Sequence, residues 1–382
     1  MNRFDYIVAG AGCAGLSFLT RLLQTGKFSD KKILLVDKAP KTVNDRTWCF
    51  WEKEPGFFEE IVYKSWDQLW FYANDHSRLH PIAPYRYKMI RGLDFYKYCF
   101  DVVNHYPNVS IRYGNVEAIT EKERGAIMQI DGELIEADYI FNSILFGQPT
   151  LRKKQFYMLQ HFKGWEIETE QPIFDPAQAT LMDFRVPQQY GTTFVYVMPF
   201  SATRALVEYT LVSKELLDKQ DYDAGLTDYL QRFLNAGNYT VLHEEFGSIP
   251  MTNYRFPAYT GAIIHLGTAG GQTRPSSGYT FQFIQKQSSA LVNSLLQEAN
   301  PLAARGFGGK RALWYDGILL RILAEGSLPG YQVFSTLFRK NSANDILQFL
   351  DNETSLWQEL KIISVLPKKV FVKAAIKQLF AQ

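Results

Sequence analysis

The sequence predicts an α/β fold organised around a dinucleotide-binding βαβ unit, and two observations support this prediction. Residues 5–19 form an apolar strand that leads through a Gly-x-Gly-x-x-Gly turn into an apolar helix. In this motif Gly10 allows the tight turn, Gly12 lets the backbone approach a pyrophosphate, and Gly15 lets the helix pack closely on the strand. The next strand ends in an acid, Asp37, 22 residues after Gly15. A carboxylate there can accept hydrogen bonds from a ribose diol.

The amino end of the predicted helix adds unpaired N–H groups and a partial positive charge, both of which favour a phosphate. A glycine pattern alone is weak evidence, because turns and linkers also use glycine. An ordinary glycine-rich turn is therefore the alternative, and the acid that ends the second strand favours the dinucleotide site.

Composition narrows the class of protein. The chain has 382 residues, 46% of them hydrophobic, which is enough for two or three domains with a large core. Its formal net charge of +2 gives no general electrostatic case for nucleic acid. The three cysteines, Cys13, Cys49 and Cys99, are far apart, so we expect no disulfide framework, no metal and a reducing compartment. No apolar run reaches the roughly 18 residues of a membrane-spanning helix, so we expect the protein not to span a bilayer.

An unusual block, Asn44-Asp45-Arg46-Thr47-Trp48-Cys49-Phe50-Trp51, follows the second strand. In one interpretation Asp45 and Arg46 pair, and the aromatic residues fill a subdomain boundary. In the other, Arg46 lies near a flavin or a phosphate, because arginine offers fixed donors, while Trp48 and Trp51 line the edge of an apolar pocket. The residues alone leave both interpretations open.

Most of the middle of the chain has the pattern of β-strands. Residues 61–89 are strand-like and contain prolines, which fits a small inserted sheet. The run 126–135 contains Asp131-Gly132, which is typical of a hairpin turn. Residues 137–143 then resemble a strand that returns to the first sheet.

Two further strands, 192–200 and 204–212, are joined by a short turn and should pair. The second contains Glu208 among β-forming residues, with Tyr209 pointing to the opposite face by strand alternation. A carboxyl group in apolar surroundings has its pKa raised by desolvation, which would make Glu208 an acid. The alternative is a glutamate on an edge strand that faces water.

A second glycine-rich junction between a strand and a helix spans residues 261–279. In many flavin oxygenases such a junction has Gly-Asp, but here it has Gly267-Thr268, so the acid that would hold ribityl hydroxyls is absent. A glycine-rich turn without a ligand is the alternative interpretation. The predicted cofactor contacts are Gly267, Gly270, Gly271, Pro275 and Gly278.

Beyond Pro301 the chain is predicted to be helical. Residues 367–380 carry four lysines and no acid, and as a helix they would place an apolar stripe beside the lysines. Such a helix can lie in an anionic membrane interface. It can equally be a solvated helix packed on its own domain.

Taken together, these motifs resemble the bacterial lycopene cyclase family of flavoproteins, particularly the lycopene β-cyclases. The resemblance covers most of the chain and is carried by residues 44–51, 206–210 and 267–279. It departs from the family at Tyr209, where the catalytic strand often has a second acid, so Glu208 must act without it. The resemblance implies a Rossmann-like, flavin monooxygenase-like FAD-binding fold with an inserted mixed-sheet substrate domain and a helical C-terminal region.

The expected domains follow from this fold. They are an FAD-binding domain of residues 1–60, 90–150 and 247–297, a substrate-binding domain of residues 61–89 and 151–246, and a membrane-contacting helical region of residues 298–382. The implied catalytic residue is Glu208, and the implied substrate pocket contains Trp48, Trp51 and Tyr209. The FAD contacts implied outside the second junction are Gly10, Gly12, Ala14, Gly15, Asp37 and Arg46.

The implied reaction closes the ends of lycopene to give β-carotene, with no net oxidation. Reduced FAD would stabilise a carbocation, and NAD(P)H would be the reductant. A hydrocarbon of about forty carbons dissolves in membranes, so the implied partners are lycopene, other carotenoids and a lipid surface on the cytoplasmic face of the cell membrane. Two rivals remain: an FAD-dependent monooxygenase or reductase acting on another isoprenoid, and a redox-silent isoprenoid-binding protein that would tolerate Glu208→Gln.

Overall fold

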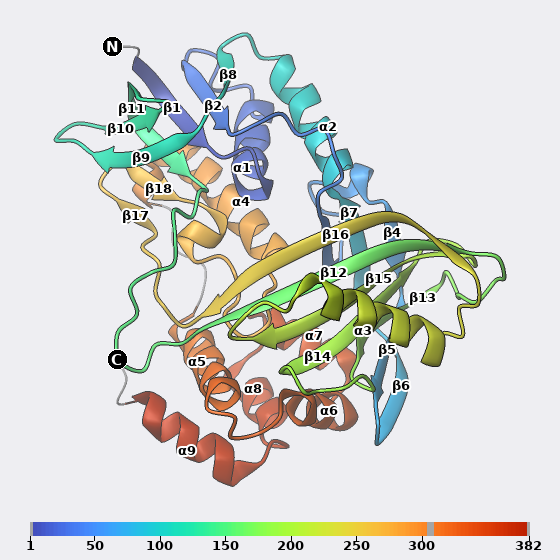
Figure 1. The fold of residues 1–382 in the computed structure, drawn as a ribbon. Coiled ribbons are helices and arrows are strands. Elements are labelled where there is room, and N and C mark those ends of the chain that lie inside the picture. The colour runs from blue at the N-terminus through green and yellow to red at the C-terminus, as the bar shows by residue number, and fades with distance from the viewer. Residues whose placement is uncertain (1–2, 304–308, 380–382) are drawn as a thin grey trace.

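A computed structural model describes residues 3–303 and 309–379, so the predicted C-terminal region is covered except for 304–308 and 380–382. Figure 1 shows an upper part built on one sheet, a second sheet that crosses the middle of the molecule, and a group of helices below it. The two long strands β12 and β16 run diagonally across this view. The predicted α/β fold is confirmed.

The upper sheet has the order β17-β18-β11-β1-β2-β8, and an antiparallel hairpin is added at β11. From β18 through β11, β1 and β2 to β8 each strand is parallel to the next, whereas β17 is antiparallel to β18. This arrangement places the carboxyl ends of β1, β2 and β11 at one edge, where ligands bind in open α/β sheets. The strands are β1 (Arg3–Ala9), β2 (Ile33–Asp37), β8 (Val109–Tyr113), β9 (Val116–Glu121), β10 (Ala126–Ile130), β11 (Glu133–Asn142), β17 (Tyr259–Thr260) and β18 (Ile263–His265).

Both faces of this sheet are covered, which explains why its central strands are continuously apolar. On one face Val8 packs with residues of α1 (Cys13–Gln24), α2 (Gly92–Asn104) and α4 (Phe281–Glu298). On the other face Ile7 packs in a cluster with residues of the β9–β10 hairpin. The predicted turn at Asp131-Gly132 is confirmed, because both residues have positive φ angles, 49° and 78°, as a type I′ turn requires.

The second sheet has the order β16-β12-β15-β14-β13-β5-β6. The predicted pairing of residues 192–200 with 204–212 is confirmed as the antiparallel pair β14–β15. One face of this sheet packs on α3 (Lys219–Arg232), and the other packs toward helices of the C-terminal region. Its strands are β5 (Gln68–Ala73), β6 (His76–Pro81), β12 (Tyr157–Thr169), β13 (Gln178–Asp183), β14 (Thr192–Pro199), β15 (Arg204–Ser213) and β16 (Tyr239–Thr252).

A third, three-stranded sheet joins the two halves and consists of β3 (Thr47–Glu52), β7 (Arg86–Arg91) and β4 (Lys64–Trp66). The segment 61–89, which we expected to form one small sheet, is therefore divided. Its β4 and β7 pair in the small sheet, whereas β5 and β6 extend the second sheet because β5 runs parallel to β13. The expected boundary between residues 246 and 247 falls inside β16.

The C-terminal region consists of helices, as predicted, which lie below the second sheet in Figure 1. The helix α9 packs on α5 through Ala374 and Ile318. Within residues 3–303 and 309–379 we find no helix with the length and apolar character needed to cross a bilayer. The helices are α5 (Lys310–Ala324), α6 (Gly330–Lys340), α7 (Ala343–Leu350), α8 (Leu356–Ile363) and α9 (Lys368–Leu379).

Candidate active site

The first glycine turn connects β1 to α1 at the carboxyl edge of the upper sheet. A side chain at Gly15 would collide with the carbonyl oxygen of Gly10, so only glycine permits this contact. A methyl group at Gly12 would meet no protein atom within 4 Å. The Ala11 N–H donates to Asp37 Oδ2 at 2.6 Å, which ties the turn to the end of β2. The open space over Gly12, at the amino end of α1, suits a phosphate.

The second glycine junction packs directly on the first. Its turn, residues Gly267–Gly270, begins with a φ angle of +55° at Gly267. A methyl group there would lie 2.7 Å from the Ala14 Cβ, so glycine is required for the two junctions to meet. The carboxyl group of Asp37, at the end of β2, lies at the same edge of the sheet. It can accept further hydrogen bonds besides the one from Ala11.

A cavity of about 490 Å³ runs from these junctions to the second sheet. It brings together seven of the predicted site residues, and its wall also contains residues that we did not predict, including Gln160, Tyr196 and Met198. A neighbouring cavity of about 850 Å³ shares Thr268 and Pro250 with it and contains the predicted Gly270, Gly271 and Pro275. The predicted residues that line the first cavity are Gly12, Ala14, Arg46, Trp48, Glu208, Gly267 and Gly278. Gly10 does not line it but lies next to Ser143, which does.

Two residues predicted for the substrate pocket lie away from this cavity. Tyr209 lies on the opposite face of β15, where its ring packs against Gly225 of α3. The strand alternation that points Glu208 into the cavity points Tyr209 out of it. Trp51 is buried in the core behind Tyr279, with the two ring centroids 4.5 Å apart. Trp51 therefore contributes to core packing and does not line the cavity.

Both interpretations of the block after β2 describe part of what the structure contains. Arg46 pairs with Asp45, whose Oδ2 is 2.9 Å from the Arg46 Nη2, and the Tyr96 hydroxyl donates to Asp45 Oδ1 at 2.9 Å. Arg46 also lines the cavity. Trp48 packs edge-on against Phe95, with ring centroids 5.0 Å apart, and lines the same cavity.

Glu208 is buried in the centre of the second sheet, since β15 lies between β12 and β14. The edge-strand alternative is therefore wrong. Only 9% of the residue is exposed, and its Oε1 accepts a hydrogen bond from the Thr210 hydroxyl at 3.0 Å. Burial and the nearby charge of Glu245 raise the pKa of Glu208 to about 8, against the opposing effect of Thr210. Glu208 is thus a neutral acid at neutral pH.

Sequence reasoning missed a second buried carboxyl, Glu245 of β16. The Thr47 hydroxyl donates to its Oε2 at 2.8 Å. Burial raises the pKa of Glu245 to about 7. The only signal in the sequence is an adjacent pair of acids, Glu244 and Glu245, within a β-forming run, and alternation then requires one of them to face inward.

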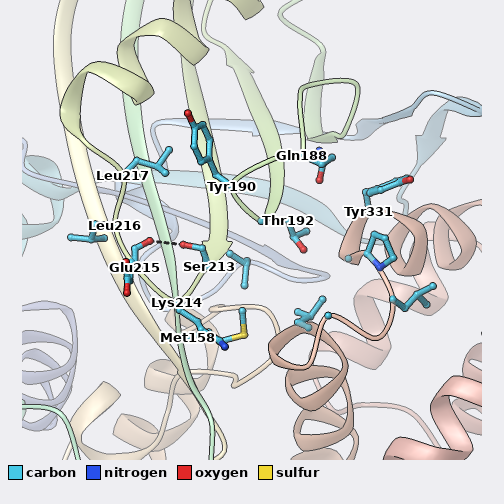
Figure 2. Close-up of a pocket in the computed structure, with 17 residues that line it drawn as sticks. Met158, Gln188, Tyr190, Thr192, Ser213, Lys214, Glu215, Leu216, Leu217 and Tyr331 are labelled. Atoms are coloured by element: carbon cyan, nitrogen blue, oxygen red, sulfur yellow. Dashed lines mark hydrogen bonds between the residues drawn. The ribbon is translucent and has the colours of Figure 1, made fainter.

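A separate cavity of about 610 Å³ lies between the ends of β14 and β15 and the helices α5 and α6 (Figure 2). Figure 2 shows Ser213 and Glu215 joined by a hydrogen bond, in which the Ser213 hydroxyl donates to the Glu215 carbonyl at 2.5 Å. Glu215, the acid among its lining residues, is exposed, and neither glycine junction reaches this cavity. The candidate active site is therefore the cavity at Glu208.

The fold and its two packed glycine junctions define the structural class of the protein: the FAD-binding, monooxygenase-like Rossmann fold. A flavoprotein/dehydrogenase from Cytophaga hutchinsonii superposes with a TM-score of 0.65 at 13% identity, over 100% of both chains. HpxO of Klebsiella pneumoniae, solved in complex with FAD, superposes with a TM-score of 0.63 at 16% identity, over 92% of this chain and 98% of that one.

The sequence comparison identifies the family. The family described as lycopene cyclase protein matches residues 5–376, so the chain belongs to the lycopene cyclase family. Lycopene beta-cyclase of Pantoea ananas is 27% identical over 65% of this chain and 63% of that protein. Lycopene beta cyclase of Narcissus pseudonarcissus is 23% identical over 77% of this chain and 60% of that protein. The chain thus spans less than two thirds of the length of these two relatives.

Proposed function

We propose that this protein is a lycopene β-cyclase that closes the linear ends of lycopene to β-ionone rings and yields β-carotene. Family membership supports the substrate class. The observation that carries the proposal is Glu208, a buried carboxyl whose pKa is raised to about 8, in a cavity continuous with the glycine junctions. A neutral acid in a dry site can protonate a carbon–carbon double bond near neutral pH.

The proposed chemistry needs one proton and no electron transfer. The O–H bond of Glu208 breaks as a C–H bond forms at the terminal double bond of lycopene. The neighbouring double bond then attacks the resulting tertiary cation and closes the ring. Loss of a ring proton completes the β-end, so substrate and product are isomers. Trp48, which lines the cavity, is the aromatic side chain that we propose to add cation–π attraction for the charged intermediate.

The residues of both junctions fit FAD. The open space over Gly12 suits the pyrophosphate, and Asp37 at the end of β2 suits the ribose. When bound in its reduced form, the flavin would supply negative charge beside the cation. NAD(P)H is the proposed reductant. Arg46, which is exposed at the cavity and pairs with Asp45, is the cation available to the cofactor there.

We also propose that the protein works at the cytoplasmic face of the cell membrane as a peripheral protein. The support comes from α9, where Val372, Ile376 and Leu379 are exposed at helical spacing. Lysines 368, 369 and 373 are exposed on the same helix. Exposed apolar side chains beside lysines are typical of a helix that lies on an anionic bilayer.

The test is anaerobic incubation of the purified protein with lycopene in liposomes and chemically reduced FAD. We expect a product of unchanged mass and shortened conjugation. In Glu208→Gln the rate should fall by about 10²–10⁴-fold, the usual contribution of a general acid, while FAD affinity is unchanged. A product that is heavier by oxygen or hydrogen would instead support a monooxygenase or reductase acting on the isoprenoid. Lipid binding without any product would support a non-catalytic carrier.

A further inference from the structure

Glu208 and Glu245 stand on one face of the second sheet with a glycine between them. Gly164 of β12 pairs with Glu208 of β15 on one side and with Glu245 of β16 on the other. Directly paired residues of neighbouring strands project to the same face, so the two carboxyls flank a position that has no side chain. A methyl group at Gly164 would lie 3.0 Å from Glu245 Cγ and 3.4 Å from Glu245 Oε1. The Glu245 side chain therefore lies over Gly164.

Each carboxyl of the pair accepts one hydrogen bond from a threonine hydroxyl. Glu245 Oε2 accepts from Thr47, whereas its Oε1 is buried and has no hydrogen-bond partner within the part of the chain that the structure describes. Glu208 accepts from Thr210 through Oε1. Among residues 3–303 and 309–379, neither carboxyl forms an ion pair with a lysine or arginine. A buried carboxyl oxygen without a donor makes ionisation more costly, so a charge on Glu245 has to be stabilised by other neighbouring groups.

The other titratable groups around the pair are of two kinds. The thiol and the phenols are neutral, because burial raises the pKa of each of them. Two basic groups, Arg46 and His243, lower the pKa of Glu245. Glu166 raises it, and the carboxyl of Glu166 is itself paired with Arg204. The neutral groups are Cys49 of β3, Tyr87 of β7, Tyr196 of β14 and Tyr279 of the loop before α4.

These contacts favour the negative charge on Glu245. The Thr47 hydroxyl and the positive charge of Arg46 both favour an ionised Glu245. Two buried carboxyls that flank one residue and interact electrostatically do not both ionise readily, so a charge on one retains a proton on the other. We propose that Glu208 and Glu245 share a single proton, with Glu245 as the ionised member, so that Glu245 is a positioning residue that holds the proton on Glu208.

The inference rests on the proposed cyclisation and assigns its last step. Once the Glu208 proton has formed the new C–H bond, both carboxylates are negative, which stabilises the nearby cation. The charge of Glu245 also makes Glu208 the stronger base. The ring C–H bond then breaks, its electrons form the double bond, and the proton returns to Glu208. The pair ends in its starting state, and no electron donor or acceptor is consumed.

The test compares Glu245→Gln with Glu244→Gln as a matched control. Glu244 is the adjacent residue of β16, but it is exposed on the opposite face, where its Oε2 lies 3.1 Å from Lys163 Nζ. Cyclisation is measured against pH on the FAD-bound proteins. Activity requires a protonated Glu208, so the wild-type rate falls as pH rises through about 8, the pKa of this carboxyl. We expect this fall to move to lower pH by about one pH unit in Glu245→Gln and to stay in place in Glu244→Gln.

A second measurement tests the sharing of the proton independently of the proposed reaction. Infrared absorption of protonated carboxyl groups is titrated in the FAD-bound protein without lycopene. We expect the wild type to lose the two protons in well-separated steps, and Glu208→Gln to show one step, at lower pH than the upper wild-type step. A titration that follows this pattern in a protein that forms no product would sustain the proton sharing and reject the cyclase proposal. A single step in Glu208→Gln at the same pH as the upper wild-type step, or a pH profile unmoved in Glu245→Gln, would overturn the inference.

Discussion

At the scale of the residue, Glu208 suits the proposed role of a proton donor because its surroundings disfavour its ionised form. Desolvation is the first cause of its raised pKa and the charge of Glu245 is the second. The β-forming run around Glu208 and strand alternation favoured an inward-facing acid but left open a glutamate on an edge strand that faces water. The sequence could not show that Glu245 lies beside Glu208, because the two residues meet only through pairing with β12, which lies between their strands.

The raised pKa has a consequence for stability. Between the ordinary glutamate value of 4.5 and about 8, the folded protein holds a proton on Glu208 that the unfolded chain has lost. The free energy of unfolding from this group therefore falls as pH rises through this window. Glutamine cannot ionise, so Glu208→Gln should raise Tm relative to wild type more at pH 9 than at pH 5.

Thermal unfolding at a series of pH values measures this difference, with Glu244→Gln as the control because its carboxyl is exposed. If the Tm difference between Glu208→Gln and wild type stays constant with pH, Glu208 is not a buried neutral acid.

At the scale of the element, the two glycine junctions offer a matched pair of substitutions. Gly12→Ala should leave the protein folded, because its methyl group meets no protein atom, but it should weaken FAD binding by occupying the space left for the pyrophosphate. Gly15→Ala should destabilise the fold itself, since its methyl group collides with the Gly10 carbonyl. Flavin fluorescence titration and thermal unfolding of the apoprotein measure the two effects.

We expect at least a tenfold loss of FAD affinity in Gly12→Ala, a change of about 1.4 kcal/mol, with Tm of the apoprotein unchanged. Unchanged FAD affinity in Gly12→Ala would show that the space over Gly12 is not a ligand site.

A third prediction concerns Gly164, the position between the two carboxyls. Gly164→Ala would press on Glu245 Cγ at 3.0 Å and on Leu206 Cδ1 at 3.1 Å, both closer than ordinary contacts. Overpacking of this kind costs about 1–3 kcal/mol. Denaturant unfolding should show a loss in this range, and the carboxyls should be forced apart, which lowers the pH at which cyclisation fails. A variant with wild-type stability and pH profile would contradict the placement of Glu245 over Gly164.

Elements close in sequence were the most predictable. The β1–α1 turn, the Asp131-Gly132 hairpin and the β14–β15 pair depend on local patterns of glycine, turn residues and alternation. The division of residues 61–89 between two sheets was not predictable, because β5 pairs with β13, which lies about a hundred residues further along the chain. Local alternation gives the buried face of such a strand but not its partner.

At the scale of the whole molecule, the exposed apolar side chains of α9 are the proposed membrane contact. The triple variant Val372→Ser, Ile376→Ser and Leu379→Ser should bind anionic vesicles at least about tenfold more weakly, because each side chain contributes apolar area to the interface. Its Tm should match wild type, since all three residues are exposed. Vesicle co-sedimentation measures the binding, with Val241→Ser and Leu242→Ser on β16 as the control for exposed apolar residues elsewhere.

Unchanged binding in the α9 triple variant, or equal loss in the β16 control, would remove α9 from the proposed contact. The basic amphipathic pattern was readable in the sequence, but which of its apolar residues remain exposed depends on how α9 packs on α5. Ala374 is buried in that contact, while Val372 and Ile376 stay outside it.

The central claim is that a proton from Glu208 starts ring closure and that no redox change occurs. Turnover of lycopene in deuterium oxide, with the protein bound to chemically reduced FAD, tests this most directly. Glu208 exchanges its proton with solvent, so each closed ring should gain one solvent deuterium and lose one substrate hydrogen, which mass spectrometry resolves. Product that carries one deuterium per ring, and is absent in Glu208→Gln, is the predicted result. Cyclised product without solvent deuterium, or product formed at the wild-type rate by Glu208→Gln, would contradict it.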